Sequence, residues 1–427
     1  MKILFKNARI LTMKDETIIK AALVVEDNRI AYIGNDYQSY APFDREIDCN
    51  NNLLMPGFKN AHAHSAMVFL RSKADDVPLQ DWLFNTVFPY EEHLQPEDIY
   101  HLNKLAYLEY LTSGITACFE HYYYPLESAR AAEDFGMRTL LLATYDKDRY
   151  PISSLMENAH RFNDAKESLV RYWIGFHAEY TSDEELLDKT KEIIDALKIP
   201  FFTHISETKK EVEECNIRHN MNPAKFLYEK GLFKYGGGGY HCIHFSNEEA
   251  EIFKDNNLTV VTCPCSNAKL ASGVAPLMKY YQMGINIALG TDGPASNNGL
   301  DMFKEMYLAA TLQKLACNDA KAIPAFEFLK MATVNAARAM GLNDADTLEK
   351  GKLADIIMID LHQPNMQPIN NIVTNLVYSG NKQNVIMTMI NGKILYENGR
   401  FFLKESPEDI YQNAERVSNR LEKETKK

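Results

Sequence analysis

Hydrophobic and polar residues alternate in a repeating pattern along the middle of the chain. Between residues 54 and 342, short apolar runs are separated by longer stretches whose hydrophobic residues recur at helical spacing. Such runs predict buried strands, and the stretches between them predict amphipathic helices. One helical stretch follows Ser182, the expected N-cap, and begins with acidic residues. The predicted strands are 54–64, 115–122, 138–145, 171–179, 200–206, 239–245, 258–264 and 285–292.

Strands that alternate with helices predict an α/β fold with a parallel sheet, because parallel neighbours need a crossover connection. At this length, a closed (β/α)₈ barrel over residues 54–344 is the economical arrangement. A doubly wound open sheet is the competing fold. It is disfavoured because the histidine and acidic residues described below fall on the first, fifth, sixth and eighth strands. A closed barrel brings those strand ends round one mouth most simply.

The two ends of the chain show strand patterns without intervening helices. Residues 1–53 and 345–405 both contain short alternating apolar runs, and Asn391-Gly392 is a strong hairpin signal. Neither end is long enough to form a stable sheet alone. We therefore expect them to pair in one small composite β-sandwich beside the barrel. Residues 406–427 predict a charged surface helix.

The composition narrows the classes of function. The 427 residues are 46% hydrophobic and 24% charged, as in ordinary globular proteins, and the formal net charge of −12 argues against a nucleic-acid partner. The start lacks the apolar stretch of a signal peptide, and no run approaches a membrane span. Seven cysteines without framework spacing suit a reducing compartment. We expect a cytoplasmic protein that acts on a small molecule; a homo-oligomer is compatible with this sequence.

Histidine and acidic residues gather at the ends of the predicted strands. His62 and His64 stand two residues apart, so on a strand their side chains share one face. His204, His241 and Asp292 stand at or near the ends of three later strands. Neutral imidazoles and a carboxylate suit a divalent, zinc-like ion. One histidine pair is common on a solvated strand, but the convergence of several strand ends predicts a metal site.

These segments resemble the amidohydrolase superfamily in their order and in the strands that carry them. The matching motifs are Pro56-Gly57-Phe58-x-Asn60-x-His62-x-His64, His204-x-x-Glu207, His241 and Gly290-Thr291-Asp292-Gly293. Three further stretches resemble the 5′-methylthioadenosine/S-adenosylhomocysteine deaminase branch of that superfamily. They are Trp82-Leu83-Phe84 with Pro89-Tyr90-Glu91, the stretch 266–273, and the stretch 292–298. The resemblance covers nearly the whole chain.

The resemblance implies one metal ion and a set of ligands. His62, His64, His204 and Asp292 would hold one divalent ion, which we expect to be zinc, with a position left for water. Zinc lowers the pKa of bound water to about 7, which makes hydroxide available at neutral pH. The fourth predicted strand carries no lysine, where two-metal relatives place a carboxylated one. A single metal ion is therefore expected.

Three residues are candidates for the chemical step. Deamination of an aminopurine needs a proton on the ring nitrogen next to the attacked carbon, and Glu207 can deliver that proton and later pass one to ammonia. His241 would orient the water and stabilise the oxygen of the tetrahedral intermediate. Asp292 can accept the proton of the water.

Further residues are candidates for substrate contacts. By resemblance, Glu91 would hold the ribose hydroxyls, Trp82 would stack on the substrate and Ser296 would contact a purine nitrogen. The alternatives are a surface acid, a packing residue and an ordinary loop serine. We interpret His121 as structural. Residues 122–124 stand at a strand end by the barrel mouth, and we interpret them as a mixture of core and surface tyrosines, with lining of the pocket as the alternative.

The chain departs from the branch in two places. Two arginines that usually hold the amino-acid carboxylate of S-adenosylhomocysteine have no counterpart after Thr144, where Arg149 is the only arginine nearby. Glu179 stands where relatives usually have a histidine, and His177 on the same strand face can substitute for it. We therefore expect Glu179 or His177 to contact the base or the sugar.

The sequence thus predicts a zinc-dependent deaminase of an adenosine-like nucleoside: 5′-methylthioadenosine, adenosine, 5′-deoxyadenosine or S-adenosylhomocysteine. The missing arginines favour a neutral 5′ group. Guanine, pterin or another amino-heterocycle is an alternative substrate, with Glu179 as its argument, and a chlorohydrolase-type reaction is another. A non-catalytic scaffold is the remote alternative. A cytidine-type zinc deaminase is excluded, since its His-x-Glu and Pro-Cys-x-x-Cys motifs are missing.

Overall fold

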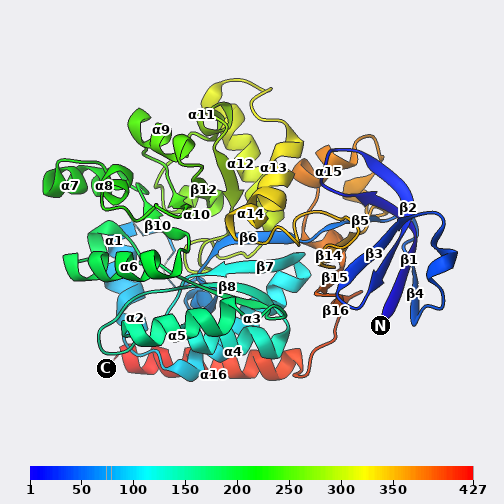
Figure 1. Cartoon of the computed structure of the whole chain (residues 1–427), viewed down its shortest axis with the longest axis horizontal. Helices are drawn as coiled ribbons and strands as arrows, with labels where there is room; N and C mark the ends of the chain where they lie inside the picture. The colour runs from blue at the N-terminus through cyan, green and yellow to red at the C-terminus, as the bar shows by residue number, and fades with distance from the viewer. Residues whose placement is uncertain (74, 78, 427) are drawn as a thin grey trace.

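The computed structural model describes residues 1–73, 75–77 and 79–426. Figure 1 shows an α/β body and, beside it, a sheet-rich part built from the two ends of the chain. The N-terminus lies in the sheet-rich part, whereas the C-terminus lies at the far end of the body. None of the described helices combines the length and the apolar composition that a membrane span requires.

The strands of the body form two parallel sheets among the described residues, in the orders β6-β7-β8-β9 and β10-β11-β12-β13. Each predicted strand run overlaps one of them, although β9 begins one residue and β11 two residues before the predicted run. Isolated parallel bridges Ala63↔Asp292 and Ala178↔His204 link the outer edges of the two sheets. Pairing therefore continues from β6 round to β13 and back to β6. The strands are β6 (Phe58–Ala63), β7 (Ile115–Glu120), β8 (Arg138–Ala143), β9 (Val170–Ile174), β10 (Phe201–Ile205), β11 (Gly237–His241), β12 (Thr259–Thr262) and β13 (Asn286–Leu289).

Helices connect these strands and cover their outer side (Figure 1). Asp183, rather than Ser182, caps the helix that starts at residue 184, because its carboxylate accepts a hydrogen bond from the backbone N–H of Leu186. The Ser182 hydroxyl instead donates to the backbone oxygen of Ala178. The helices are α3 (Pro96–Thr112), α4 (Pro125–Phe135), α5 (Ile152–Asn163), α6 (Glu184–Leu197), α7 (Lys209–His219), α8 (Pro223–Glu229), α9 (Asn247–Asp255), α10 (Pro264–Lys269), α11 (Leu277–Gln282), α12 (Met302–Cys317), α13 (Ala325–Ala332) and α14 (Val334–Ala339).

The connection from β6 to β7 is longer than the others and contains several short helical pieces before α3. They are the 3₁₀ segment η2 (Ser65–Leu70), α1 (Leu79–Trp82), the π-helical turn η3 (Leu83–Val87) and α2 (Phe88–Glu91).

Strands from both chain ends lie in one nine-stranded sheet among the described residues, in the order β17-β16-β15-β14-β5-β1-β2-β3, with β4 paired to β1. Within this sheet, the strands of the two chain ends are joined where β5 pairs with β14 in antiparallel orientation. Its strands are β1 (Lys2–Leu11), β2 (Ile18–Glu26), β3 (Arg29–Gly34), β4 (Arg45–Asp48), β5 (Leu53–Pro56), β14 (Ile356–Ile359), β15 (Val385–Ile390), β16 (Lys393–Glu397) and β17 (Arg400–Phe401). Helix α15 (Ile372–Tyr378) lies between β14 and β15.

The first predicted strand, 54–64, is wrong as a single element. It divides at Gly57 into β5, which belongs to the sheet of the chain ends, and β6, which belongs to the body. A Cβ atom at Gly57 would stand 2.1 Å from a methyl carbon of Thr116, so only glycine fits where the chain passes between the sheets. The sheet of the chain ends therefore includes residues up to Pro56, and the first strand of the body begins at Phe58.

Residues near the C-terminus form helix α16 (Pro407–Thr425), drawn in red in Figure 1. Ser406 caps it, and it contacts α3, α2 and η2. Its apolar residues recur at helical spacing and are buried against the body: Ile410, Ala414, Val417 and Leu421. The helix is thus amphipathic and docked along its length.

A buried ion pair joins the sheet of the chain ends to the body. The Arg138 guanidinium donates to both carboxylate oxygens of Asp355, at 2.7 and 2.9 Å, and both side chains are nearly inaccessible to solvent. Asp355 also accepts from the backbone N–H of Asn391 in the predicted hairpin turn. Bidentate geometry and this third bond satisfy a carboxylate that burial would otherwise destabilise.

Replacing Arg138 with Ala should therefore leave Asp355 buried and unpaired. We expect the free energy of unfolding, measured by urea denaturation, to fall by about 3–5 kcal/mol. The matched control is Arg45→Ala, which breaks the more exposed bidentate pair with Glu397 and should cost less than about 1 kcal/mol. Equal losses in the two variants would contradict a special role for the buried pair.

Candidate metal centre and substrate cavity

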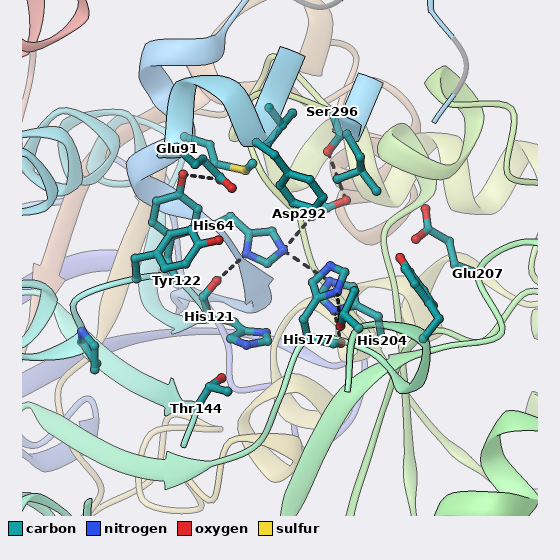
Figure 2. A pocket seen from close by; sticks show the side chains of 18 of the residues that line it. His64, Glu91, His121, Tyr122, Thr144, His177, His204, Glu207, Asp292 and Ser296 are labelled. Atoms are coloured by element: carbon teal, nitrogen blue, oxygen red, sulfur yellow. Dashed lines mark hydrogen bonds and ion pairs between the residues drawn. The ribbon is translucent and has the colours of Figure 1, made fainter. Parts of the chain in front are cut away.

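Five side chains converge at the C-terminal ends of the body's strands. The ligand atoms of His62, His204, His241 and Asp292 lie within 4.8 Å of one another. His64 belongs to the same group, since its Nε2 lies 3.4 Å from Asp292 Oδ1 and 3.3 Å from His204 Nε2. Figure 2 shows His64, His204 and Asp292 directed toward a common point. We refer to these five residues as the centre.

Three imidazoles of the centre are oriented by an oxygen that can only accept a hydrogen bond. Nδ1 must therefore donate in each pair, and Nε2 keeps its lone pair free for the centre. Ligating histidines in metal sites are commonly fixed in this way. The three pairs are His64 with the backbone oxygen of His121, His204 with the backbone oxygen of His177 at 2.7 Å, and His241 with the side-chain oxygen of Asn267 at 2.7 Å.

His62 is fully buried, yet neither of its ring nitrogens has a hydrogen-bond partner within the described part of the chain. Its ring stacks on Tyr240 at 3.8 Å, and its Nε2 lies 3.4 Å from Asp292 Oδ1. Burial lowers the pKa of His62 to about 3, so the imidazole is neutral. A buried lone pair without a donor is a group that a cation can satisfy.

Asp292 supplies the negative charge of the centre. Burial alone would raise its pKa, but the adjoining His62 and the other imidazoles outweigh that effect and hold the pKa well below its usual range. Its carboxylate also accepts from Ser266 Oγ at 2.5 Å, from the backbone N–H of Gly293 at 2.8 Å and from Ser296 Oγ at 3.1 Å. Neutral imidazoles around a carboxylate are a donor set that suits a divalent metal ion.

The backbone at two strand ends adopts a left-handed conformation. His241, Cys242 and Asp292 have φ values of 70°, 49° and 60°. Such residues cost of order 1–3 kcal/mol each and persist where the surroundings hold them. The Tyr280 hydroxyl donates to the backbone oxygen of Cys242 at 2.7 Å, and the backbone N–H of Asp292 donates to the backbone oxygen of His62 at 3.0 Å.

Glu207 follows β10 and lies beside the centre. Its carboxylate accepts from Ser272 Oγ at 3.1 Å and lies 3.9 Å from His241 Nε2. Burial raises the pKa of Glu207, which favours its protonated form. Glu211 fixes the backbone here, because its carboxylate accepts from the N–H groups of Ser206 and Glu207 at 2.6 and 2.8 Å.

A cavity of about 340 Å³ opens beside the centre. Its wall contains His64, His204, His241 and Asp292 together with Glu207. The apolar part of the wall comes mainly from the β6–β7 connection: Met67, Trp82, Leu83, Val87 and Phe88. This volume and this combination of apolar and polar groups are typical of small-molecule sites.

Four of the predicted substrate contacts line the cavity: Trp82, Glu91, His177 and Ser296. Glu91 accepts a hydrogen bond of 2.6 Å from the Tyr122 hydroxyl (Figure 2), and burial raises its pKa to about 7. Trp82 is buried, and its indole N–H has no partner within the described residues. The Ser296 hydroxyl contacts Asp292.

Glu179 is not among the cavity-lining residues, which corrects its predicted contact with the substrate. Its carboxylate is buried and accepts from Arg218 Nε at 3.0 Å, while His219 Nε2 lies 2.8 Å from it. These partners tie the segment after β9 to α7. His177, Tyr180 and Thr181 of that segment line the cavity, and the backbone oxygen of His177 orients His204.

Further residues of the wall come from the segments that follow β7 and β8. His121, Tyr122 and Tyr123 line the cavity at the end of β7, so the structural interpretation of His121 was incomplete and two of the three tyrosines face the site. Their position after a strand that neighbours β6 is the signal that could have indicated this. Thr144 and Arg149 line the cavity after β8.

Known proteins resemble this chain in sequence and in structure. A sequence profile of the Amidohydrolase family matches residues 53–395. A protein of Thermoanaerobacter pseudethanolicus named 5-methylthioadenosine/S-adenosylhomocysteine deaminase is 37% identical over 434 residues, covering 99% of this chain and 100% of that protein. A Pyrococcus furiosus protein of the same name is 38% identical over 404 residues, covering 93% and 96%.

A solved structure described as an adenosine deaminase from Xanthomonas campestris with bound zinc is also similar. It superimposes with a TM-score of 0.92 at 28% identity, covering 99% of this chain and 98% of that chain. Because the family profile spans most of the chain and these relatives align over nearly their whole length, the chain belongs to the amidohydrolase family.

Proposed function

We propose that this protein is a zinc-dependent deaminase that converts an adenosine-like nucleoside to the inosine-like product and ammonia. The observation that carries the proposal is the position of Glu207, a buried carboxyl group with a raised pKa, beside a centre of buried imidazoles and one carboxylate. The names of its relatives support the substrate class. We further infer that β6 to β13 form one (β/α)₈ barrel and that the sheet of the chain ends forms a composite β-sandwich.

The centre would hold the metal through Nε2 of its histidines and through Asp292. His62, His64, His204 and Asp292 are the proposed ligands, and His241 is the proposed orienting residue, although its distance would also allow it to ligate. A zinc ion bound there would lower the pKa of water to about 7 and so supply a nucleophile at neutral pH.

The protein's own groups would handle the protons. Protonated Glu207 would donate to the purine ring nitrogen next to the attacked carbon, which keeps negative charge from developing on the ring. Asp292 would accept the proton lost by the attacking water. His241 would donate from Nε2 to the oxygen of the tetrahedral intermediate if it is protonated, a state that the neighbouring Glu207 and Asp292 favour by raising its pKa against the effect of burial. As the carbon–nitrogen bond breaks and the carbonyl forms, Glu207 would take up the hydroxyl proton of the intermediate and pass it to the amino group, which leaves as ammonia. The proton held by Asp292 would then return to Glu207, which restores both groups.

The cavity wall would select the substrate. Glu91, held by Tyr122, would accept hydrogen bonds from the ribose hydroxyls, and Trp82 lies in the same wall. Thr144 stands at the end of β8, where a carboxylate-binding arginine is absent, and the nearby Arg149 is exposed. The cavity wall therefore offers Glu91 to the ribose hydroxyls but no buried cation to a carboxylate, which favours a substrate with a neutral 5′ group.

The position of Glu179 no longer supports the alternative substrates. Glu179 favoured guanine, pterin or another amino-heterocycle, but its carboxylate is paired with Arg218 and lies outside the cavity wall. No observation on the described residues favours a chlorohydrolase-type reaction over deamination. A non-catalytic scaffold would not need Glu207 buried beside a complete set of ligand-type residues.

We expect one divalent metal ion per chain in elemental analysis of protein purified without added metal. Asp292→Ala removes the one carboxylate of the proposed ligand set, so metal content and turnover should both fall below about a tenth of the parent values. The control is His160→Ala, which alters an exposed histidine on α5 and should retain one ion per chain. Two ions per chain, or none after zinc is supplied, would contradict the mononuclear site.

Glu207→Gln keeps the shape of the side chain but removes the proton that it donates. Turnover should fall by about 10²- to 10⁴-fold while metal content stays at one ion per chain. Glu213→Gln, an exposed neighbour on α7, serves as the control and should match the parent rate. Nearly parental turnover in the Glu207→Gln variant would show that Glu207 is only a structural residue.

Competition of substrates in one reaction tests the specificity. We expect 5′-methylthioadenosine or adenosine to be preferred to S-adenosylhomocysteine by more than roughly a hundredfold in kcat/KM, the loss expected for two missing charge-assisted contacts. Arg149→Leu should leave that ratio unchanged. A preference for S-adenosylhomocysteine that disappears in Arg149→Leu would instead identify Arg149 as the carboxylate contact.

A further inference from the structure

Much of the apolar wall of the cavity comes from one long connection, between β6 and β7. Trp82, Leu83, Val87 and Phe88 lie on the short helices between residues 79 and 91, and all four line the cavity. Glu91, the proposed ribose contact, ends the last of these helices. Trp82, Leu83 and Val87 are buried in the core, and polar contacts on either side of them add to what holds this wall in position.

One carboxylate oxygen on the C-terminal helix contacts this connection at two places, before the wall and near its end. Oε2 of Glu422 accepts a hydrogen bond of 2.6 Å from the Tyr90 hydroxyl and forms an ion pair with Lys73. The Lys73 ammonium also lies 5.1 Å from the centre of the Tyr90 ring. Lys73 precedes the wall and Tyr90 directly precedes Glu91, so these contacts close the connection into a loop at Glu422.

The remainder of α16 fixes Glu422 in place. Leu421 is fully buried against the body, and Arg420 forms an ion pair with Asp98 at the start of α3 and donates to the backbone oxygen of His93 at 3.2 Å. Figure 1 shows α16 running beneath the body, with the C-terminus near α2. Lys426 also pairs with Glu422 through the other carboxylate oxygen, at 2.5 Å.

We propose that Glu422 is a positioning residue for the substrate site, acting through Lys73 and Tyr90 to hold Trp82 and Glu91 in the cavity wall. Its effect on the substrate rests on the proposed function, whereas its effect on the wall does not. The three cationic or hydroxyl groups around it keep the carboxylate ionised, since they lower the pKa of Glu422 to about 2. Removing the Glu422 carboxylate would leave the centre intact and loosen only the wall between residues 79 and 91.

Kinetics of Glu422→Ala in the full-length protein test the effect on the substrate. KM for the preferred nucleoside should rise by about tenfold while kcat stays within about twofold, because the lost contact acts on binding and not on the reacting atoms. Tyr90→Phe should raise KM similarly, and the double variant should add little to either single change. Glu415→Ala, an exposed acid on the same helix, is the matched control and should leave KM unchanged.

Hydrogen exchange tests the effect on the wall without any substrate. Backbone amides of residues 79–92 should exchange faster in Glu422→Ala than in the parent, while those of β10 and β11 should not change. Glu422→Gln, which keeps the shape of the side chain, should show a smaller change in the same direction. Unchanged exchange over residues 79–92 would overturn the proposal. If no nucleoside is deaminated by the parent protein, the proposed function fails, and the exchange result still decides the role of Glu422.

Discussion

The site depends on holding the charged carboxylate of Asp292 among buried, neutral imidazoles. Water cannot stabilise that charge, so the protein supplies two hydroxyls, a backbone N–H and the adjoining His62 and His64. The bridge Ala63↔Asp292 that joins the first and last strands of the body places the carboxylate beside the two histidines of β6. The pairing that joins the first strand of the body to the last therefore also brings Asp292 to His62 and His64.

The same arrangement recurs at the other junction. The bridge Ala178↔His204 joins β9 to β10, and the backbone oxygen of His177 beside it orients the His204 ring. Each junction between the two four-stranded sheets thus carries a residue of the centre. Displacement of either junction would move a ligand-type side chain. The geometry of the site therefore depends on both junctions between the two sheets.

The sequence was sufficient to predict what is repeated or local. Apolar runs separated by helical stretches predict each strand of the body, and the order of His62, His204, His241 and Asp292 on strand ends predicts their convergence. The division of the first run at Gly57 was not predicted, because it depends on the contact with Thr116 from another strand. The position of Glu179 outside the cavity wall was not predicted for a similar reason, since its partners Arg218 and His219 lie on α7, beyond α6 and β10. The hydrogen bond from Tyr90 to Glu422, next to the cavity wall, likewise joins segments that no short-range pattern connects.

The pairing of β5 with β14 has a consequence for the order of folding. The N-terminal strands leave the ribosome first, but the edge of β5 that β14 will cover stays open until the whole body has been synthesised. An open edge of buried, apolar residues such as Leu53, Leu54 and Met55 is a template for pairing with other chains. The nascent chain must therefore carry β5 with one unpaired edge through most of its synthesis, until β14 is available to pair with it.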